Sequence, residues 1–209
     1  MPTTKPDSAQ VHALSLHFVL LKSVQPLPLH WLNHSELQWL HGKSAKRTQS
    51  FVWSRALLRQ LCCQLLNVTQ QQVVISLPAE QKPELWVAGT KYHCSVSHSK
   101  DMVAVVLSSI GAVGLDVEYI CPQRDKQPYA TLYPALSNYC VSDQQFYQRW
   151  TALEATLKLS GGDLFALLAQ PEPELAPELK CWQQLGYQFC VASQQHLTSL
   201  QQQQVLQLP

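Results

Sequence analysis

The 209-residue sequence has little net charge and no long apolar run, and each absence argues against a class of function. Its 15 lysines and arginines nearly balance 14 aspartates and glutamates, so the net charge of +1 argues against a nucleic-acid-binding surface. No apolar run approaches the length of a membrane-spanning helix, and the N-terminus lacks a signal-peptide pattern. We therefore expect a cytoplasmic protein that binds neither nucleic acid nor membrane.

The seven cysteines contain no C-x-x-C pair, which argues against a zinc site. Their number is odd, and we expect reduced, mostly buried thiols. A hydrophobic content of 46% with only 14% charged residues is typical of a globular chain. The sequence shows no internal repeat, and its length suits one large domain or two small ones.

What the sequence does contain is a short stretch, Val113 to Glu118, that can carry a site. Its alternation of apolar and polar positions predicts a strand. The odd-numbered positions face a core, whereas Gly114, Asp116 and Glu118 share the opposite face. Two carboxylates side by side suit a hard cation such as Mg²⁺, or alternatively Mn²⁺, and Gly114 lets another group approach the backbone. The simpler interpretation is a solvent-facing strand edge that bears two acids.

A second segment carries an acid and a base at helical spacing. An apolar stripe predicts a helix that starts near Ser142 and ends near Gly161. The stripe consists of Phe146, Trp150, Leu153 and Leu157. Glu154 and Lys158 are four residues apart, so they are neighbours on one helix face. Such a pair alone is usually helix support, but with the strand it completes three carboxylates and one ammonium.

The remaining pattern predicts an α+β chain. We expect helices at 31–41 and 50–66, and strands at 11–21, 73–77, 92–96, 102–108, 187–191 and 197–208. A polar turn is predicted from Ser97 to Asp101, and a loop with short helical pieces from 119 to 142. The four glutamines from Gln201 to Gln204 are interpreted as a tolerated surface feature.

Five segments in this order resemble the motifs of the 4′-phosphopantetheinyl transferases. The last two resemble the signatures G-[IV]-D-[IVL]-E and W-x-x-K-E-[AS]-x-x-K, and the three earlier ones resemble A-R-x-L-L, K-P-x-L and N-x-S-H-S. The segments are Ser54–Leu58, Lys82–Leu85, Ser95–Ser99, Gly114–Glu118 and Trp150–Lys158. The order and approximate spacing are similar to those of the Sfp-type branch, in which one chain carries both halves of a pseudo-dimer.

The resemblance implies two similar α/β subdomains, residues 1–110 and 111–209, related by a pseudo-twofold axis with a cleft between them. It further implies a monomeric, Mg²⁺-dependent holo-[acyl-carrier-protein] synthase. Such an enzyme moves 4′-phosphopantetheine from coenzyme A to a serine of an apo acyl or peptidyl carrier protein and releases 3′,5′-ADP. The carrier proteins of this family serve fatty-acid, polyketide or nonribosomal peptide biosynthesis.

The same resemblance assigns roles to individual residues. The implied metal ligands are Asp116, Glu118 and Glu154, and the implied catalytic residues are Glu154, Lys158 and Asp116. The implied coenzyme A contacts are Lys43, Lys46, Arg55, Lys82, Pro83, Ser97 and His98. Glu154 is implied as a metal ligand, as the general base for the carrier serine, or as both. Lys158 is implied to stabilise phosphate charge.

The second signature contains a departure from the family pattern that changes the charge of the site. The family usually has lysine immediately before the signature glutamate, where this chain has Leu153. The departure removes one cation from the phosphate neighbourhood and leaves the three carboxylates in place. This departure keeps one alternative open, a catalytically silent relative that binds coenzyme A or a carrier protein. A second alternative, independent of Leu153, is a Mg²⁺-dependent phosphohydrolase that uses water as the acceptor.

Overall fold

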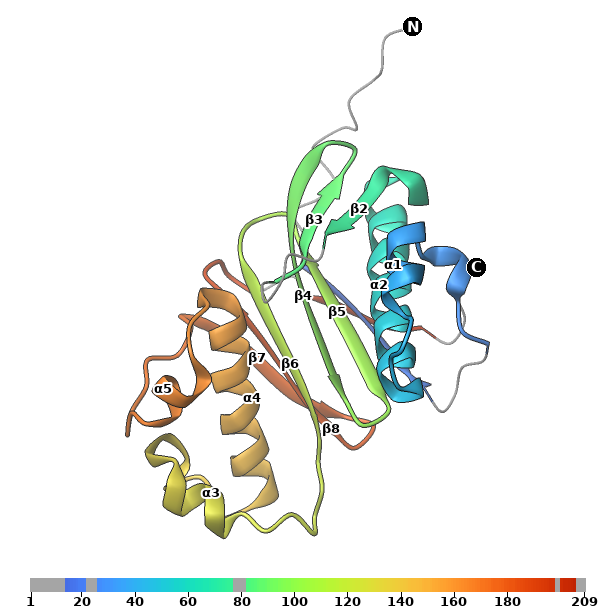
Figure 1. Ribbon diagram of the computed structural model, residues 1–209. Helices are drawn as coiled ribbons and strands as arrows, with labels where there is room; N and C mark the ends of the chain where they lie inside the picture. Colours follow the sequence, from blue (N-terminus) through green and yellow to red (C-terminus); the bar gives the residue numbers. More distant parts are fainter. Residues whose placement is uncertain (1–13, 22–25, 77–81, 198–199, 206–209) are drawn as a thin grey trace, which may run out of the picture.

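The computed structural model describes residues 14–21, 26–76, 82–197 and 200–205, which form four layers of secondary structure (Figure 1). A long helix covers the outer face of a larger sheet, a smaller sheet packs on the inner face, and a second long helix covers that smaller sheet. The predicted α+β class is therefore confirmed.

The larger sheet has six strands in the order β2-β3-β4-β5-β1-β9. Their bounds are β1 Ser15–Leu20, β2 Val73–Ser76, β3 Glu84–Val87, β4 Thr90–Ser99, β5 Met102–Ser108 and β9 Gln201–Gln204. Strand β9 pairs in parallel with β1, so the glutamine run supplies a strand to this sheet. Most of its side chains are exposed, as expected of a surface feature. The outer parts of two predicted strands, 11–13 and 206–208, lie outside the described residues, as do 77 and 198–199.

The smaller sheet has three strands in the order β6-β8-β7, all paired antiparallel. Their bounds are β6 Val113–Tyr119, β7 Glu178–Gln184 and β8 Tyr187–Ser193. Strands β5, β6 and β8 lie where the alternation predicts them. The sequence analysis missed β7, because its side chains are nearly all half-buried and show no two-residue contrast.

Five α-helices and three 3₁₀ helices are seen in the described part of the chain. They are η3 Leu29–Trp31, α1 His34–Trp39, α2 Ala45–Leu66, η4 Gln70–Gln72, α3 Gln127–Leu132, η5 Pro134–Leu136, α4 Asp143–Ser160 and α5 Leu164–Leu168. Helix α4 starts after Ser142, whose side chain accepts a hydrogen bond from the backbone N–H of Gln145, as predicted. None of the helices described is long and apolar enough to cross a membrane.

Two predicted helices begin at different residues from those expected. Helix α2 starts five residues before the predicted Ser50, because the Ser44 side chain caps it by accepting from the N–H of Arg47. Lys46 is therefore part of the helix. Helix α1 starts three residues late, because Asn33 and Glu36 form a capping box there.

The predicted turn from Ser97 to Asp101 is wrong in its length. Strand β4 continues through Ser99, which pairs with Met102 of β5, so only two residues connect the strands. Lys100 has a positive φ of 53°, which such short connections require. Ser97 and His98 are consecutive strand residues, so their side chains lie on opposite faces of β4.

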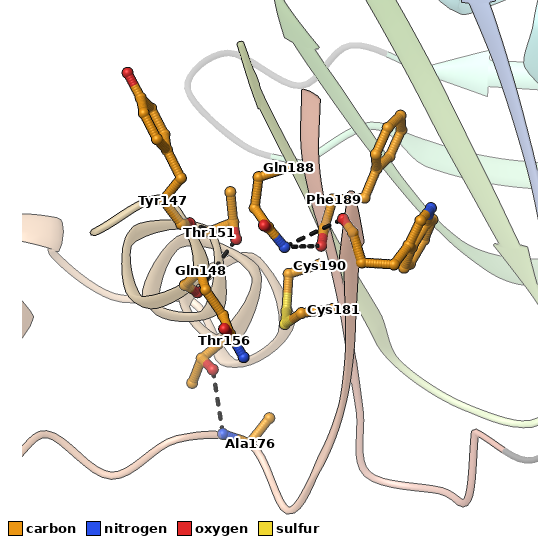
Figure 2. Close-up of a disulfide and its surroundings, with 10 residues drawn as sticks. Tyr147, Gln148, Thr151, Thr156, Ala176, Cys181, Gln188, Phe189 and Cys190 are labelled. Carbon is orange, nitrogen blue, oxygen red and sulfur yellow. Dashed lines mark hydrogen bonds between the residues drawn. A yellow bond between two sulfur atoms is a disulfide. The ribbon is translucent and has the colours of Figure 1, made fainter. Parts of the chain in front are cut away.

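The expectation of reduced cysteines is wrong for one pair. Cys181 of β7 and Cys190 of β8 form a disulfide, because the register of the two strands places them directly opposite each other, 4.1 Å apart at Cα. Figure 2 shows this bond between the strand pair and α4. The other five cysteines are free thiols.

Candidate functional site

A close contact between β6 and α4 creates the site. Gly114 lies against the backbone of α4, where an added methyl would be 2.6 Å from the amide nitrogen of Leu159 and closer still to the carbonyl oxygen of Ala155. The predicted close approach at Gly114 is thus confirmed, and the approaching group is a helix. Alternation then directs Asp116 and Glu118 toward the same helix, whereas Leu115 and Val117 are buried between the two sheets.

Asp116 is the buried centre of the site, with 3% of its surface exposed. Its Oδ1 atom accepts hydrogen bonds from Lys158 Nζ at 2.7 Å and from Ser97 Oγ at 2.9 Å. Lys158 Nζ also donates to Ser97 Oγ at 3.0 Å. The other carboxylate oxygen, Oδ2, is buried and has no hydrogen-bond partner among the described residues. One oxygen of this carboxylate is therefore neutralised, and the other is buried without a donor in the described part of the chain, which is unusual for a polar atom.

Two further carboxylates lie close enough to Asp116 to feel its charge. Desolvation by burial, and then the charge of Asp116, raise the pKa of both Glu118 and Glu154. The Ser99 hydroxyl, which donates to Glu118 Oε2 at 2.8 Å, opposes the shift for Glu118. The nearby charge of Lys158 likewise opposes the upward shift of the pKa of Glu154. Glu154 and Lys158 are thus neighbours on α4, as predicted, whereas the short ion pair of Lys158 is with Asp116 of β6.

The three carboxylates fit a divalent cation in charge and donor type. They repel one another, and one buried oxygen of Asp116 lacks a donor. Oxygen donors of this kind suit Mg²⁺. Within the described ranges, however, no three His, Cys, Asp or Glu side chains are already arranged as ligands of one ion. Lys158 neutralises part of the cluster in this arrangement.

A cleft of about 580 Å³ lies beside this cluster, lined by residues from both sheets and from α4. Of the predicted site residues, Lys82, Pro83 and Lys158 line it. Lys82 Nζ donates to the Leu159 carbonyl at 3.1 Å, and desolvation lowers the pKa of this lysine. The cleft wall also contains Lys91 and His93, which the sequence analysis did not single out.

His98 and Lys46 lie together on the other face of β4, near the start of α2. Desolvation lowers the pKa of His98 most, followed by the charge of Lys158 and then that of Lys46. Two positive charges therefore act on the imidazole, and the charge of Asp116 opposes them. Such a group of donors and cations suits an anion.

Two predicted coenzyme A contacts lie in other surroundings. Arg55 is buried, with 4% exposed, and its Nε is 3.5 Å from Glu36 Oε1. Glu36 also pairs with buried Arg59 at 2.9 Å. Lys43 Nζ lies 4.8 Å above the ring of Trp39, in a cation–π contact at the start of α2. Neither residue lines the cleft.

Leu153 is buried, with 1% exposed, on the side of α4 that faces α5 and η5. Its apolar neighbours include Leu136, Phe146 and Leu168. The packing role expected for this leucine is therefore confirmed. The cleft side of the helix presents Leu157 and Lys158 instead.

The sequence analysis missed two polar residues of the site, Ser95 and Ser99. Their hydroxyls contact the backbone of β6, as does that of Ser97. The signal was present as hydroxyl residues at every second position, but its meaning depended on a distant strand that no local pattern identifies.

No protein-family model matches the sequence. Among curated proteins, the chain is similar to 4′-phosphopantetheinyl transferase AcpT of Salmonella typhi, with 30% identity over 98 residues, which cover 43% of this chain and 51% of that protein. It is 28% identical over 137 residues to 4′-phosphopantetheinyl transferase HetI of a Nostoc species, covering 61% and 57%. For an AcpT of Escherichia coli the identity is 27% over 113 residues, covering 50% and 58%. The chain spans about half the length of the curated relatives it matches.

Proposed function

Because this chain belongs to the 4′-phosphopantetheinyl transferase superfamily, we propose that it transfers the 4′-phosphopantetheine group of coenzyme A to a serine of an apo carrier protein. The observation that carries the proposal is the pairing of Asp116 with Lys158 beside the cleft, since the two family signatures meet there. The carboxylates suit a cation, and the lysine suits a phosphate.

Coenzyme A would enter with its phosphates toward the lysines of the cleft. Lys82 and Lys158 line one cavity of about 580 Å³, which would hold the phosphates and part of the pantetheine arm. The imidazole of His98 and the ammonium of Lys46 would supply a second pair of hydrogen-bond donors, on the other face of β4. We assign the 3′-phosphate to this second group, with Arg55 and Lys43 as further candidates from the family pattern.

The reaction breaks one phosphorus–oxygen bond and forms another. The carrier serine hydroxyl attacks the phosphorus on the pantetheine side of the pyrophosphate, and 3′,5′-ADP leaves. Glu154 accepts the serine proton, a role suited by burial and neighbouring charges that raise its pKa. Lys158 stabilises negative charge on the phosphate oxygens. Asp116, Glu118 and Glu154 would hold Mg²⁺, which neutralises the pyrophosphate when bound.

The two-part division of the chain also belongs to this proposal. We infer two subdomains, 1–110 and 111–209, related by a pseudo-twofold axis. In support, each sheet carries one long helix, α2 or α4, on its outer face. Strand β9 would then link the subdomains, since it follows the second in sequence and pairs with β1 of the first.

The carrier protein would dock beside α4, where large apolar side chains are exposed. Leu132 of α3, Val141 before α4 and Phe165 of α5 are 67%, 82% and 68% exposed. Helices α3 and α5 both contact η5, so these side chains belong to one end of the molecule (Figure 1). Exposed apolar groups of this size are typical of an interaction surface.

The test is the intact mass of apo carrier proteins incubated with this protein, coenzyme A and Mg²⁺. We expect a gain of one phosphopantetheine group on the carrier, dependent on Mg²⁺ and lost with Asp116→Ala. Wild-type protein that binds coenzyme A but modifies no carrier protein across several classes would instead support the silent relative. Release of phosphate from coenzyme A without modified carrier would support a phosphohydrolase.

A further inference from the structure

Three serines at alternate positions of β4 join the two sheets at the site. The hydroxyl oxygens of Ser95, Ser97 and Ser99 accept hydrogen bonds from the backbone N–H groups of 115, 117 and 119 in β6, at 3.0, 3.2 and 3.1 Å. The constant offset of 20 residues means that the two strands run parallel. Strand β6 is at the edge of its sheet, so these N–H groups have no backbone partner on that side. The hydroxyls replace the missing strand.

Two of the three hydroxyls also donate to a carboxylate. Ser97 Oγ donates to Asp116 Oδ1 at 2.9 Å, and Ser99 Oγ donates to Glu118 Oε2 at 2.8 Å. In each case the carboxylate belongs to the residue just before the N–H that the same serine accepts. For Ser95 the corresponding residue is Gly114, which has no side chain. All three serines therefore bond to the backbone of β6, but only Ser97 and Ser99 also bond to a carboxylate.

The geometry fixes the direction of the Ser97 hydroxyl proton. A serine oxygen has two lone pairs and one proton. The oxygen of Ser97 uses its lone pairs for the N–H of Val117 and the ammonium of Lys158, so its proton can only be donated elsewhere. That proton lies toward Asp116 Oδ1 and leaves the buried Oδ2 without a donor. A carboxylate held at one oxygen presents the other in a defined direction.

We propose that Ser97 and Ser99 are positioning residues that hold the carboxylates of Asp116 and Glu118 in place for a divalent cation, with the backbone of β6 fixing the serines in turn. The inference deepens the proposed function and rests on it for the identity of the reaction. It also gives Ser97 a task other than contact with coenzyme A, because its single proton is already donated to Asp116. Outer partners of this kind orient metal ligands, and losing one costs about 10- to 100-fold in metal affinity.

The test compares Ser99→Ala with Ser95→Ala in the full chain, using Mn²⁺ alone as the probe. Both variants lose one hydrogen bond to β6, but only the first frees a carboxylate. We expect Ser99→Ala to weaken Mn²⁺ binding at least about tenfold, measured by electron paramagnetic resonance of free Mn²⁺. Ser95→Ala should bind within about twofold of wild type, although both variants should lower the melting temperature.

A third variant checks that the hydroxyl itself matters. Ser99→Thr keeps the hydroxyl and should bind Mn²⁺ like wild type, whereas binding as weak as that of Ser99→Ala would overturn the proposal. If the alanine variant does not fold, Ser99→Cys takes its place, since a thiol is a weak donor. Equal weakening by Ser95→Ala, no weakening by Ser99→Ala, or a wild type that binds no Mn²⁺ would each overturn it as well.

Carrier modification is measured in parallel with the metal titration. A wild type that binds Mn²⁺ and shows the expected serine pattern, but modifies no carrier protein, refutes the proposed function and leaves the positioning role standing. If the wild type modifies carrier protein, and Ser95→Ala, Ser99→Ala and Ser99→Thr all bind Mn²⁺ as tightly as the wild type, only the positioning role is refuted.

Discussion

Gly114→Ala perturbs the contact on which the site depends. The new methyl would lie 2.6 Å from the Leu159 amide nitrogen, whereas ordinary contact begins at about 3.4 Å, so the helix backbone must withdraw by at least about 0.8 Å. The obstacle is backbone and not a flexible side chain. Overpacking of this kind costs about 1–3 kcal/mol of unfolding free energy. The withdrawal also separates Lys158 from Asp116, whose nitrogen and oxygen are 2.7 Å apart.

The expected result is a loss of activity larger than the loss of stability alone explains. A misplacement of about 1 Å at reacting groups can lower the rate about 10²-fold. Transfer is measured by the intact mass of a carrier protein at a temperature where the variant is folded, and urea unfolding gives its stability. Leu115→Ala is the matched control, because the neighbouring side chain is buried between the sheets and faces away from α4.

Leu115→Ala should cost about 2–5 kcal/mol of stability and leave α4 in place. It should therefore retain most of the transfer activity while folded. A Gly114→Ala variant with wild-type stability and wild-type activity would refute the close helix contact. Equal activity losses in the two variants would show that general destabilisation, and not displacement of α4, controls the rate.

Four further predictions concern Lys158, Glu154, Arg55 and the disulfide. Lys158→Met should lower the transfer rate about 10²- to 10³-fold in single-turnover assays, because it removes the cation beside Asp116; an unchanged rate would exclude Lys158 from the reaction. Burial and then the charge of Asp116 raise the pKa of Glu154 above its ordinary value of 4.5. The contribution of Glu154 to the unfolding free energy is therefore fully present below pH 4.5, and it is lost as the pH rises through the raised pKa. Glu154→Gln should therefore be more stable than wild type to urea at pH 7 but not at pH 4, and equal differences at both pH values would contradict this. Arg55→Ala should raise the KM for coenzyme A more than the KM for dephospho-coenzyme A, because the family pattern assigns Arg55 to the 3′-phosphate. Arg59→Ala is the control, since Arg59 also pairs with Glu36, and losing either arginine should lower the unfolding free energy by about 3–5 kcal/mol. Identical KM changes for both ligands would exclude a 3′-phosphate contact. Reduction of the Cys181–Cys190 bond by a dithiol should lower the unfolding free energy by about 2–3 kcal/mol in urea, as expected for a loop this short, and no change should occur in Cys181→Ala.

Local patterns were enough to predict β6 and α4, the two elements that carry the site. The alternation in β6 identified which side chains face the carboxylate cluster. The glycine at 114 indicated that another group lies close to the strand backbone. Ser142 and Gly161 marked the ends of α4. In each case a few neighbouring residues determine the structure, so the sequence is sufficient.

Contacts between distant residues were not predictable in this way. Ser97 and Ser99 were assigned to a turn because hydroxyl residues favour turns, and the strand pairing that keeps them in β4 depends on residues of β5. The burial of Arg55 depends on Glu36, whose own position is set by a capping box in another helix. The cysteine pair required the register of a hairpin whose first strand has no alternation.

The three sides of α4 explain how one helix can serve both the fold and the site. Ala152 and Ala155 are small, so the helix lies close to the smaller sheet, and Gly114 removes the last side chain in the way. This short separation lets aspartate, the shorter acid, reach Lys158. Leu153 faces a separate apolar cluster, so a lysine at that position would have to leave this cluster to approach the cleft. This chain therefore uses the position of the family lysine for packing, whereas Lys158 keeps its cation beside Asp116.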